Sequence, residues 1–334
     1  MFETLKSVFK VKEMRRKLLY LIWMIFIIRI GCQIPVPGVD SDFFKQWFSS
    51  NAGDAFNFFD AFTGGSFERM SIFALNITPY ITSSIIIQLL TIAIPALEEM
   101  QRDGEEGRKK MTAITRYVTV GLALFESIAM AIGFGRQGMI PNLDFFKGVV
   151  VVACLTAGSA MLMWLGERIT EKGVGNGISI VLTINIISRV PSDLTLLYEN
   201  FIKGKTIAKG TLAGLIIAAV ILLVVVLVLI LNGAERRIPV QYSRKMVGRK
   251  MMGGQSTNIP LKVNTAGVIP VIFASSIMSF PSIIAQFAGK GNGTGIGSEI
   301  LRGLSSNNWC NPSQIQYSWG LIVYVVLCVF FAYF

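Results

Sequence analysis

Long apolar runs separated by short polar segments dominate the chain. The clearest run, "LAGLIIAAVILLVVVLVLIL" from Leu212 to Leu231, contains no charge, and about 20 such residues are enough to cross a hydrocarbon core. Hydropathy predicts helical spans at 18–34, 72–94, 114–135, 148–168, 177–190, 211–232, 265–287 and 317–334. The fifth is short and is interrupted by Thr183 and Asn185. The pattern therefore predicts an all-α polytopic membrane protein.

The first apolar run can be interpreted in two ways. Arg15, Arg16 and Lys17 precede the run from Leu18 to Ile30, as in a secretory signal peptide. However, the chain continues with "GCQIPVPGVD", which offers no small-x-small cleavage site, and Arg29 interrupts the run. We therefore expect a retained first helix.

A segment between the first two spans is unusually rich in phenylalanine. In "DAFNFFDAFTGGSFERM", residues 54–70, four phenylalanines precede Gly64 and Gly65. Eight or nine helical residues rise only about 13 Å, which is too little to span a membrane. The segment is therefore either an interfacial aromatic belt or a short element folded back into a cavity, where irregular backbone is tolerated.

Composition supports a membrane protein and disfavours catalysis. Only 15% of residues are charged, against about 25% in soluble chains. The chain has no histidine, and its four cysteines are scattered without zinc or redox spacing. No paired carboxylates or Ser/Lys arrangement suggest an active site. We expect neither an enzyme nor a metal or cofactor site.

The basic residues predict an orientation. With the N-terminus inside, the inner segments 1–17, 98–116, 167–172 and 235–262 hold 20 Lys and Arg, whereas the outer side holds ten. An excess of this kind marks the cytoplasmic side. We therefore expect a cytoplasmic N-terminus, with 1–17 forming a cytoplasmic basic segment.

The 235–262 loop is the most basic segment, with seven cations and only Glu235 as an anion. It is either a retention signal that contacts anionic lipid or a docking site for a polyanion such as RNA or for an acidic protein surface. Composition alone leaves both interpretations open.

The second and seventh spans share a short motif. "PYITSSI" from Pro79 resembles "PVIFASSI" from Pro270, apart from one inserted residue. In the first copy, Ile81 and Ile85 lie on one helical face because they are four residues apart. Ordinary packing explains one such helix. The repetition suggests that the two spans are counterparts in related halves, as in many transport folds.

Five motifs in order resemble the SecY family, whose members are channel subunits of the bacterial protein translocase. They are "TPYITSSIIIQLL", "EGRKKMTAITRY", "GERITEKGVGNGISI", "RRIPVQYSRK" and "NTAGVIPVIFASSI". The family has ten membrane helices, so the resemblance implies that about eight are present and that this chain lacks the last two. Phe334, inside an apolar run, also suggests a C-terminal truncation.

The resemblance implies an hourglass channel built from two pseudo-symmetric helix bundles. Residues 18–196 would form the first half, with helices one to five, and 197–334 an incomplete second half, with helices six to eight. Such a channel passes unfolded secretory polypeptides across the bacterial cytoplasmic membrane and releases transmembrane segments sideways into it. The chain has no Walker-type GxxxxGK[ST] motif, so energy would come from a partner or from the membrane potential.

The resemblance also assigns roles to individual residues. The aliphatic pore ring would comprise Ile81, Ile85, Leu182, Ile186 and Ile272. A plug at about 54–66 would include Phe56, Phe58, Phe59, Phe62, Gly64 and Gly65. Ser84, Gln88, Thr91, Asn264 and Ser275 would be polar groups of a lateral gate between helices two and seven. Branched aliphatic side chains suit such a ring because they form a deformable, dewetting constriction.

The basic loops would then bind partners. Arg108, Lys109, Arg244, Lys245, Arg249 and Lys250 would contact ribosomal RNA of a docked ribosome or the SecA motor ATPase. Further expected partners are SecE- and SecG-like small membrane subunits, the nascent or secretory polypeptide and anionic lipid.

An ion-coupled small-solute transporter is the alternative function. It would use an ionisable residue near the bilayer midplane, and Glu126 in "LALFESIAM" is the candidate. A single acid without a nearby cation in its span supports this alternative weakly.

Overall fold

The computed structural model is divided into two compact units. Its described residues are 11–41, 43–46, 60, 62–136, 138, 140, 144–203, 207–240, 245–247, 250–252, 257–287, 296–304, 309 and 315–333. The first unit comprises Met1–Pro191 with Phe273–Leu327, and the second comprises Ser192–Ile272 with Cys328–Phe334.

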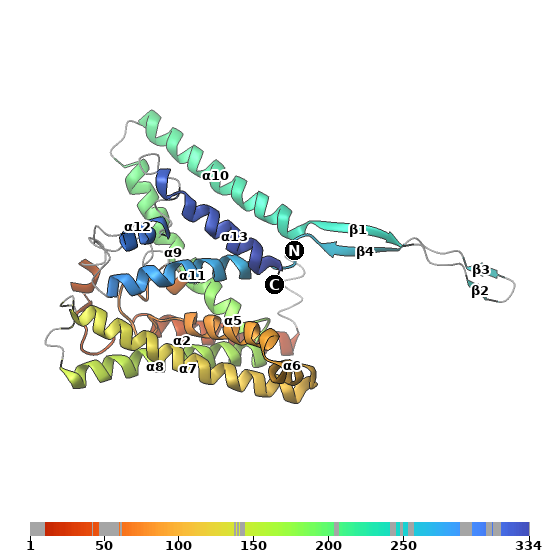
Figure 1. Cartoon of the computed structure of the whole chain (residues 1–334). Coiled ribbons are helices and arrows are strands. Elements are labelled where there is room, and N and C mark those ends of the chain that lie inside the picture. Colours follow the sequence, from red (N-terminus) through yellow and green to blue (C-terminus); the bar gives the residue numbers. More distant parts are fainter. Residues whose placement is uncertain are drawn as a thin grey trace. The chain divides into compact units, whose positions relative to one another are not determined.

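Each expected span coincides with a helix (Figure 1). In chain order they are α2 (Lys12–Gly31), α5 (Thr78–Ala93), α7 (Gly104–Arg136), α8 (Phe145–Lys172), α9 (Gly177–Phe201), α10 (Ile207–Gly233), α11 (Ile269–Phe287) and α13 (Trp319–Tyr333). Among the described residues, four helices (α7 to α10) are long and apolar enough to cross a membrane, or five if the bent pair α5–α6 is one span.

The second span starts later than predicted and is followed by a bent second helix. Residues 64–77 form turns instead of helix, and α5 begins only at Thr78. At its other end, α6 (Pro95–Arg102) is bent from α5 by 103°. The proline ring disfavours helical geometry for the preceding residue, and Ile94 is extended, with φ −115° and ψ 110°.

The fifth helix is longer than predicted. The hydropathy pattern suggested 177–190, whereas α9 continues for 25 residues and contains Pro191. The polar residues Thr183 and Asn185 therefore do not interrupt the helix.

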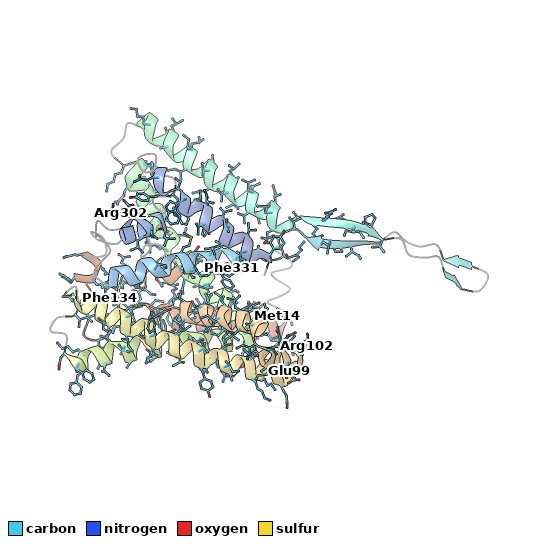
Figure 2. All side chains as sticks on the ribbon, viewed as in Figure 1. Met14, Glu99, Arg102, Phe134, Arg302 and Phe331 are labelled. Atoms are coloured by element: carbon cyan, nitrogen blue, oxygen red, sulfur yellow. The ribbon has the colours of Figure 1, made fainter. Side chains whose placement is uncertain are left out.

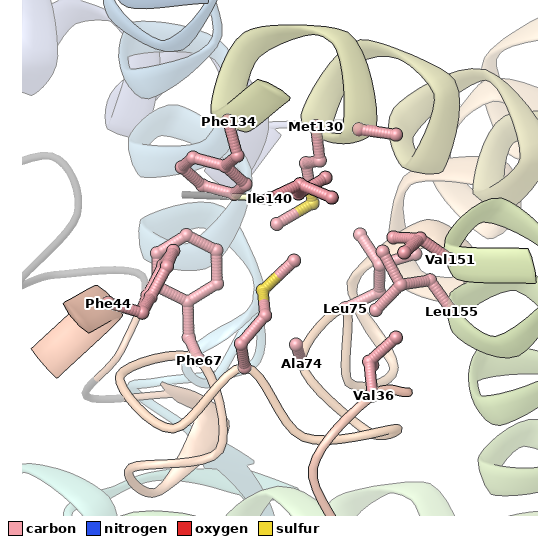
Figure 3. Close-up of a cluster of buried hydrophobic side chains, with 12 residues drawn as sticks. Val36, Phe44, Phe67, Ala74, Leu75, Met130, Phe134, Ile140, Val151 and Leu155 are labelled. Atoms are coloured by element: carbon pink, nitrogen blue, oxygen red, sulfur yellow. The ribbon is translucent and has the colours of Figure 1, made fainter. Parts of the chain in front are cut away.

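Two hydrophobic clusters lie in the first unit. The first joins α7 and α8, which lie side by side (Figure 1), to the turns before α5. Phe44 packs edge-on against Phe134 with ring centroids 5.0 Å apart (Figure 3). The cluster consists of Val36, Phe44, Phe67, Met70, Ala74, Leu75, Met130, Ala131, Phe134, Ile140, Val151 and Leu155.

The second cluster joins α2, α8 and α9 around the start of α5. Its members are Met24, Ile28, Cys32, Phe73, Ile77, Leu162, Leu165, Ile169 and Val181. Close backbone approach accompanies this packing: a Cβ added to Gly158 on α8 would lie 2.0 Å from the carbonyl oxygen of Ile72. The turns at 64–77 are therefore pressed directly against α8.

The second unit contains strands that the sequence pattern did not predict. After α10, strands β1 (Glu235–Val240) and β4 (Thr257–Lys262) pair antiparallel, with Glu235 opposite Lys262. A smaller hairpin, β2 (Lys245–Val247) with β3 (Lys250–Met252), lies between them in sequence. The described residues of the basic 235–262 loop therefore form two antiparallel strand pairs, β1 with β4 and β2 with β3, which are together called the β-ribbon (Figure 1).

The segment between α11 and α13 contains two short helices, α12 (Ile296–Leu304) and η2 (Ile315–Tyr317). The indole Nε1 of Trp309 donates to the carbonyl oxygen of Gly303, 2.8 Å away. This bond ties the end of α12 to the segment before α13.

Candidate functional site

The two isoleucines of α5 lie at the packed start of that helix. Ile85 is buried, and Ile81 is half-buried and packs against the second hydrophobic cluster. Their helix begins after Asn76, which has a left-handed φ of 51°, and its second residue is Pro79, a position where proline's missing N–H costs no hydrogen bond.

The neighbouring hydroxyls face different surroundings. Ser83 is fully buried, and its Oγ lies 2.5 Å from Oγ1 of Thr119 on α7. Ser84 is half-buried and Gln88, one turn later, is exposed. The hydroxyl of Thr91 is buried and donates to the Ile87 carbonyl oxygen at 2.7 Å. Ser83 therefore joins α5 to α7, while Ser84 and Gln88 lie on a different strip of α5.

The remaining ring and gate residues are divided between the units. Leu182 is half-buried and Ile186 is 44% exposed, both on the part of α9 in the first unit. Ser275 on α11 is buried in the first unit. Ile272 and Asn264 belong to the second unit, where the Asn264 side-chain oxygen accepts a bond from the Gly267 amide at 3.0 Å.

Only the end of the expected plug belongs to the described residues. Phe56, Phe58 and Phe59 lie outside them, while Phe62 is half-buried. Gly64 and Gly65 have φ values of +67° and +81°, in the left-handed region that favours glycine. A Cβ on Gly64 would lie 2.6 Å from the Asn185 carbonyl oxygen, so this glycine also allows the chain to lie against α9.

A buried ion pair ties the same segment to α9. Asp60 is completely buried, and its Oδ2 pairs with the Arg189 guanidinium on α9. Its other oxygen, Oδ1, accepts from the Glu68 amide at 3.0 Å and from the Thr63 hydroxyl at 3.2 Å. One carboxylate thus organises the turn and joins it to a helix.

A chain of side-chain amides lies beside this pair. Arg29 on α2 donates to Oδ1 of Asn185 at 2.6 Å and to the Ile184 carbonyl oxygen at 3.1 Å. Asn185 donates to Oδ1 of Asn76 at 3.0 Å, and Asn76 donates to the Phe62 carbonyl oxygen at 2.7 Å. These bonds connect α2, α9, the start of α5 and the end of the plug segment.

Sequence reasoning missed this polar network as a site. Arg29 and Asn185 were noticed only as interruptions of apolar runs, and Asp60 and Arg189 were not singled out. A usable signal was present, because polar and charged residues within membrane spans are costly and usually have named partners. The identity of the partners, however, depends on contacts between residues as far apart as 156 positions.

The expected partner-binding cations are placed in part. Arg108 and Lys109 are exposed in the first turns of α7. Lys245 is the first residue of β2 and Lys250 the first residue of β3. Arg244 and Arg249 lie outside the described residues. Figure 2 shows Glu99 and Arg102 of the neighbouring α6 at the same end of the first unit as Met14.

Among the described residues, nothing around Glu126 supports the small-solute transporter alternative. Glu126 is half-buried on α7, and no ion pair to it is found among the described residues. The same residues contain no group of three or more acidic or cysteine side chains that could hold a metal ion.

Comparison with known proteins gives a consistent result. The family model described as SecY matches residues 71–334. The protein translocase subunit SecY of Streptomyces galbus is 41% identical over 98% of this chain and 74% of its own length. A solved structure described as a protein conducting channel has a TM-score of 0.65 at 19% identity, covering 95% of this chain and 71% of its own.

A further solved structure, Sec61 in the canine ribosome–channel complex from the endoplasmic reticulum, has a TM-score of 0.62 at 20% identity. It covers 95% of this chain and 71% of its own. These similarities do not support the small-solute transporter alternative.

Proposed function

Because the chain belongs to the SecY family of protein translocase subunits, we propose that its aliphatic side chains on α5 and α9 form the constriction of a protein-conducting channel. The channel passes unfolded secretory polypeptides across the membrane and releases transmembrane segments sideways into it. It supplies a path rather than a reaction, and we propose that the chain is not an enzyme.

One observation carries the assignment of the constriction. The bond between Asn76 and Asn185 holds the start of α5 against the middle of α9. Along α5, Ile81 and Ile85 follow Asn76 by five and nine residues, and along α9, Leu182 and Ile186 flank Asn185. Such side chains let a polypeptide of any sequence slide, because they offer no strong hydrogen bonds, and they hinder ions and water while the channel is idle. Ile272 would complete this part of the ring.

The plug and the lateral gate are likewise proposed because the chain belongs to the SecY family. The segment 54–66 would block the path, with Gly64 and Gly65 as its hinge. Ser84, Gln88 and Thr91 on α5 would face Asn264 and Ser275 near α11 across the gate. The half-buried Ser84 and exposed Gln88 are available for bonds that can break and re-form, whereas the Thr91 hydroxyl donates to its own helix.

Cytoplasmic partners would bind at the basic loops. The exposed Arg108 and Lys109 and the lysines of the β-ribbon are suited to ribosomal RNA or to an acidic surface of SecA. Sec61, a protein of similar fold, occurs in a ribosome–channel complex. SecE- and SecG-like subunits, nascent chains and anionic lipids would complete the assembly.

The similarity to bacterial SecY subunits supports a location in the bacterial cytoplasmic membrane, and the distribution of Lys and Arg supports an N-terminus in the cytoplasm. In this orientation the start of α7 and the β-ribbon lie on the cytoplasmic side. The hinge of the plug segment then lies toward the outer side.

Site-specific crosslinking tests the constriction. A photoreactive amino acid at Ile85 should crosslink to a secretory chain stalled in transit. The same probe at Phe125, which is exposed on α7, should label lipid or other membrane subunits instead. Equal labelling of the stalled chain from both positions, or none from Ile85 during active translocation, would refute the proposed path.

A further inference from the structure

The C-terminal end of the proposed plug is folded around one buried carboxylate. The side chain of Asp60 has no exposed surface, and its Oδ1 accepts two hydrogen bonds from residues 63 and 68. Its backbone oxygen accepts from the Gly64 amide at 2.9 Å. A buried charge is costly unless it is paired and hydrogen-bonded, so this turn depends on a cationic partner.

That partner comes from a different element. Arg189 on α9 pairs with the free carboxylate oxygen of Asp60, and its side chain is 20% exposed. Removing one member of such a pair leaves an uncompensated charge, which costs far more than an exposed ion pair is worth. The hinge of the plug therefore has an energetic reason to remain on α9.

Two further contacts hold the end of the plug segment against α9. The Phe62 carbonyl oxygen accepts from Asn76, which in turn accepts from Asn185 on α9. Gly64 lies against the Asn185 carbonyl oxygen so closely that no side chain fits between them. Three contacts thus converge on one stretch of α9, from residue 185 to residue 189.

We propose that Asp60 and Arg189 are a positioning pair that holds the plug hinge on α9 and sets the threshold for opening. Arg189 lies three residues after Ile186, so both share one face of the helix. A polypeptide that pushes Ile186 outward moves Arg189 and Asn185 with it. Widening of the constriction therefore strains the contacts that hold the plug. This inference rests on the proposed channel function and on the plug assignment.

The first test removes the pair. Purified translocase complexes reconstituted into proteoliposomes are assayed for ion leak without substrate and for translocation of a preprotein with a weakened signal sequence. Arg189→Gln should raise both at least several-fold, whereas Arg189→Lys, which keeps the charge, should stay near wild type. The double variant Asp60→Asn/Arg189→Gln should leak no more than Arg189→Gln alone, since no unpaired charge remains.

Arg116→Gln is the matched control. It breaks an ion pair of similar type between α7 and α8, Arg116 with Glu167 at 2.8 Å, far along the chain from the plug. This variant should leave the idle leak unchanged. A leak equal to that of Arg189→Gln would show a general effect of lost ion pairs and would overturn the proposal.

A second pair of variants does not alter charge. Gly64→Ala and Gly65→Ala impose similar backbone strain because both glycines have positive φ. Only the Gly64 position has atoms of α9 within 4 Å of the added Cβ. Gly64→Ala should therefore leak more than Gly65→Ala, and equal leaks would contradict the hinge contact even if Arg189→Gln failed to fold.

The outcomes separate this inference from the proposed function. If the wild-type complex translocates and Arg189→Gln shows wild-type leak and signal requirement, the positioning pair is refuted and the channel stands. If the wild-type complex conducts no polypeptide, the proposed function itself fails.

Discussion

Asn185 donates a hydrogen bond from its side-chain amide to Oδ1 of Asn76 across 3.0 Å, and this bond joins the middle of α9 to the turn that precedes α5. Asn185 simultaneously accepts from Arg29 at 2.6 Å. A single amide therefore accepts from a half-buried cation on α2 and positions the helix that carries Ile81 and Ile85.

Asn185→Ala should destabilise the protein. The change leaves Arg29 and Asn76 without one partner each, and an unsatisfied buried polar group costs about 1–3 kcal/mol. Thermal unfolding of the purified protein in detergent should show a clear decrease in Tm. Thr183→Ala is the control, because that exposed hydroxyl bonds only within its own helix, and an equal decrease for both variants would contradict the network.

Ser83→Leu and Ser84→Leu should differ sharply. Ser83 is buried against Thr119, so a larger side chain would force α5 from α7 and cost about 1–3 kcal/mol. Ser84 is only half-buried and should tolerate leucine at under half that cost. Tm measurements on the two variants decide this prediction, and a larger effect at Ser84 would refute it.

Gly158→Ala should be destabilising although alanine is the better helix former. Its added Cβ would lie 2.0 Å from the Ile72 carbonyl oxygen, so the backbone must shift, at a cost of about 1–3 kcal/mol. Gly148 is on the same helix, and a Cβ added there would have no atom within 4 Å. Gly148→Ala should therefore raise the free energy of unfolding by about 0.5–1 kcal/mol. The two unfolding midpoints should move in opposite directions.

Reversing charge at the start of α7 should weaken ribosome binding. The double variant Arg108→Glu/Lys109→Glu replaces two exposed cations, and lost phosphate contacts reduce both affinity and its dependence on salt. Co-sedimentation of the reconstituted complex with empty ribosomes, at two salt concentrations, measures this. Lys203→Glu, on the expected outer side, should bind as wild type does.

The helices could be predicted from sequence because membrane thickness imposes long apolar runs, and each predicted span contains a helix among its described residues. Their ends could not. The delayed start of α5 follows from the left-handed Asn76 and its distant partners, and the continuation of α9 past Val190 contradicts the usual effect of Pro191. The β-ribbon was missed because charge, rather than alternation, dominates residues 235–262.

For the candidate site, sequence reasoning could name residues but not their contacts, and the roles of those residues stay predictions. Motif position pointed to Ile81 and Ile85, and hydrophobicity explained why such residues suit a constriction. Which of two adjacent serines faces α7 depends on how the helices rotate against each other, and sequence spacing alone does not determine it. The Asp60–Arg189 pair required the fold. Arg189 is the one charged residue of the predicted span 177–190, but its partner lies 129 positions earlier in the chain.

The long helix α7 connects the exposed basic turns around Arg108 with the aromatic cluster around Phe134. A helix of 33 residues is about 50 Å long, against about 30 Å for a hydrocarbon core. Arg108 stands near one end, and near the other Phe134 packs with Phe44 and Phe67 (Figure 3). Because the helix is continuous, a tilt imposed on the turns around Arg108 must also move the aromatic cluster at its far end. In the proposed orientation these turns are cytoplasmic. Mechanical work delivered in the cytoplasm would therefore reach the outer side of the membrane without crossing a flexible joint.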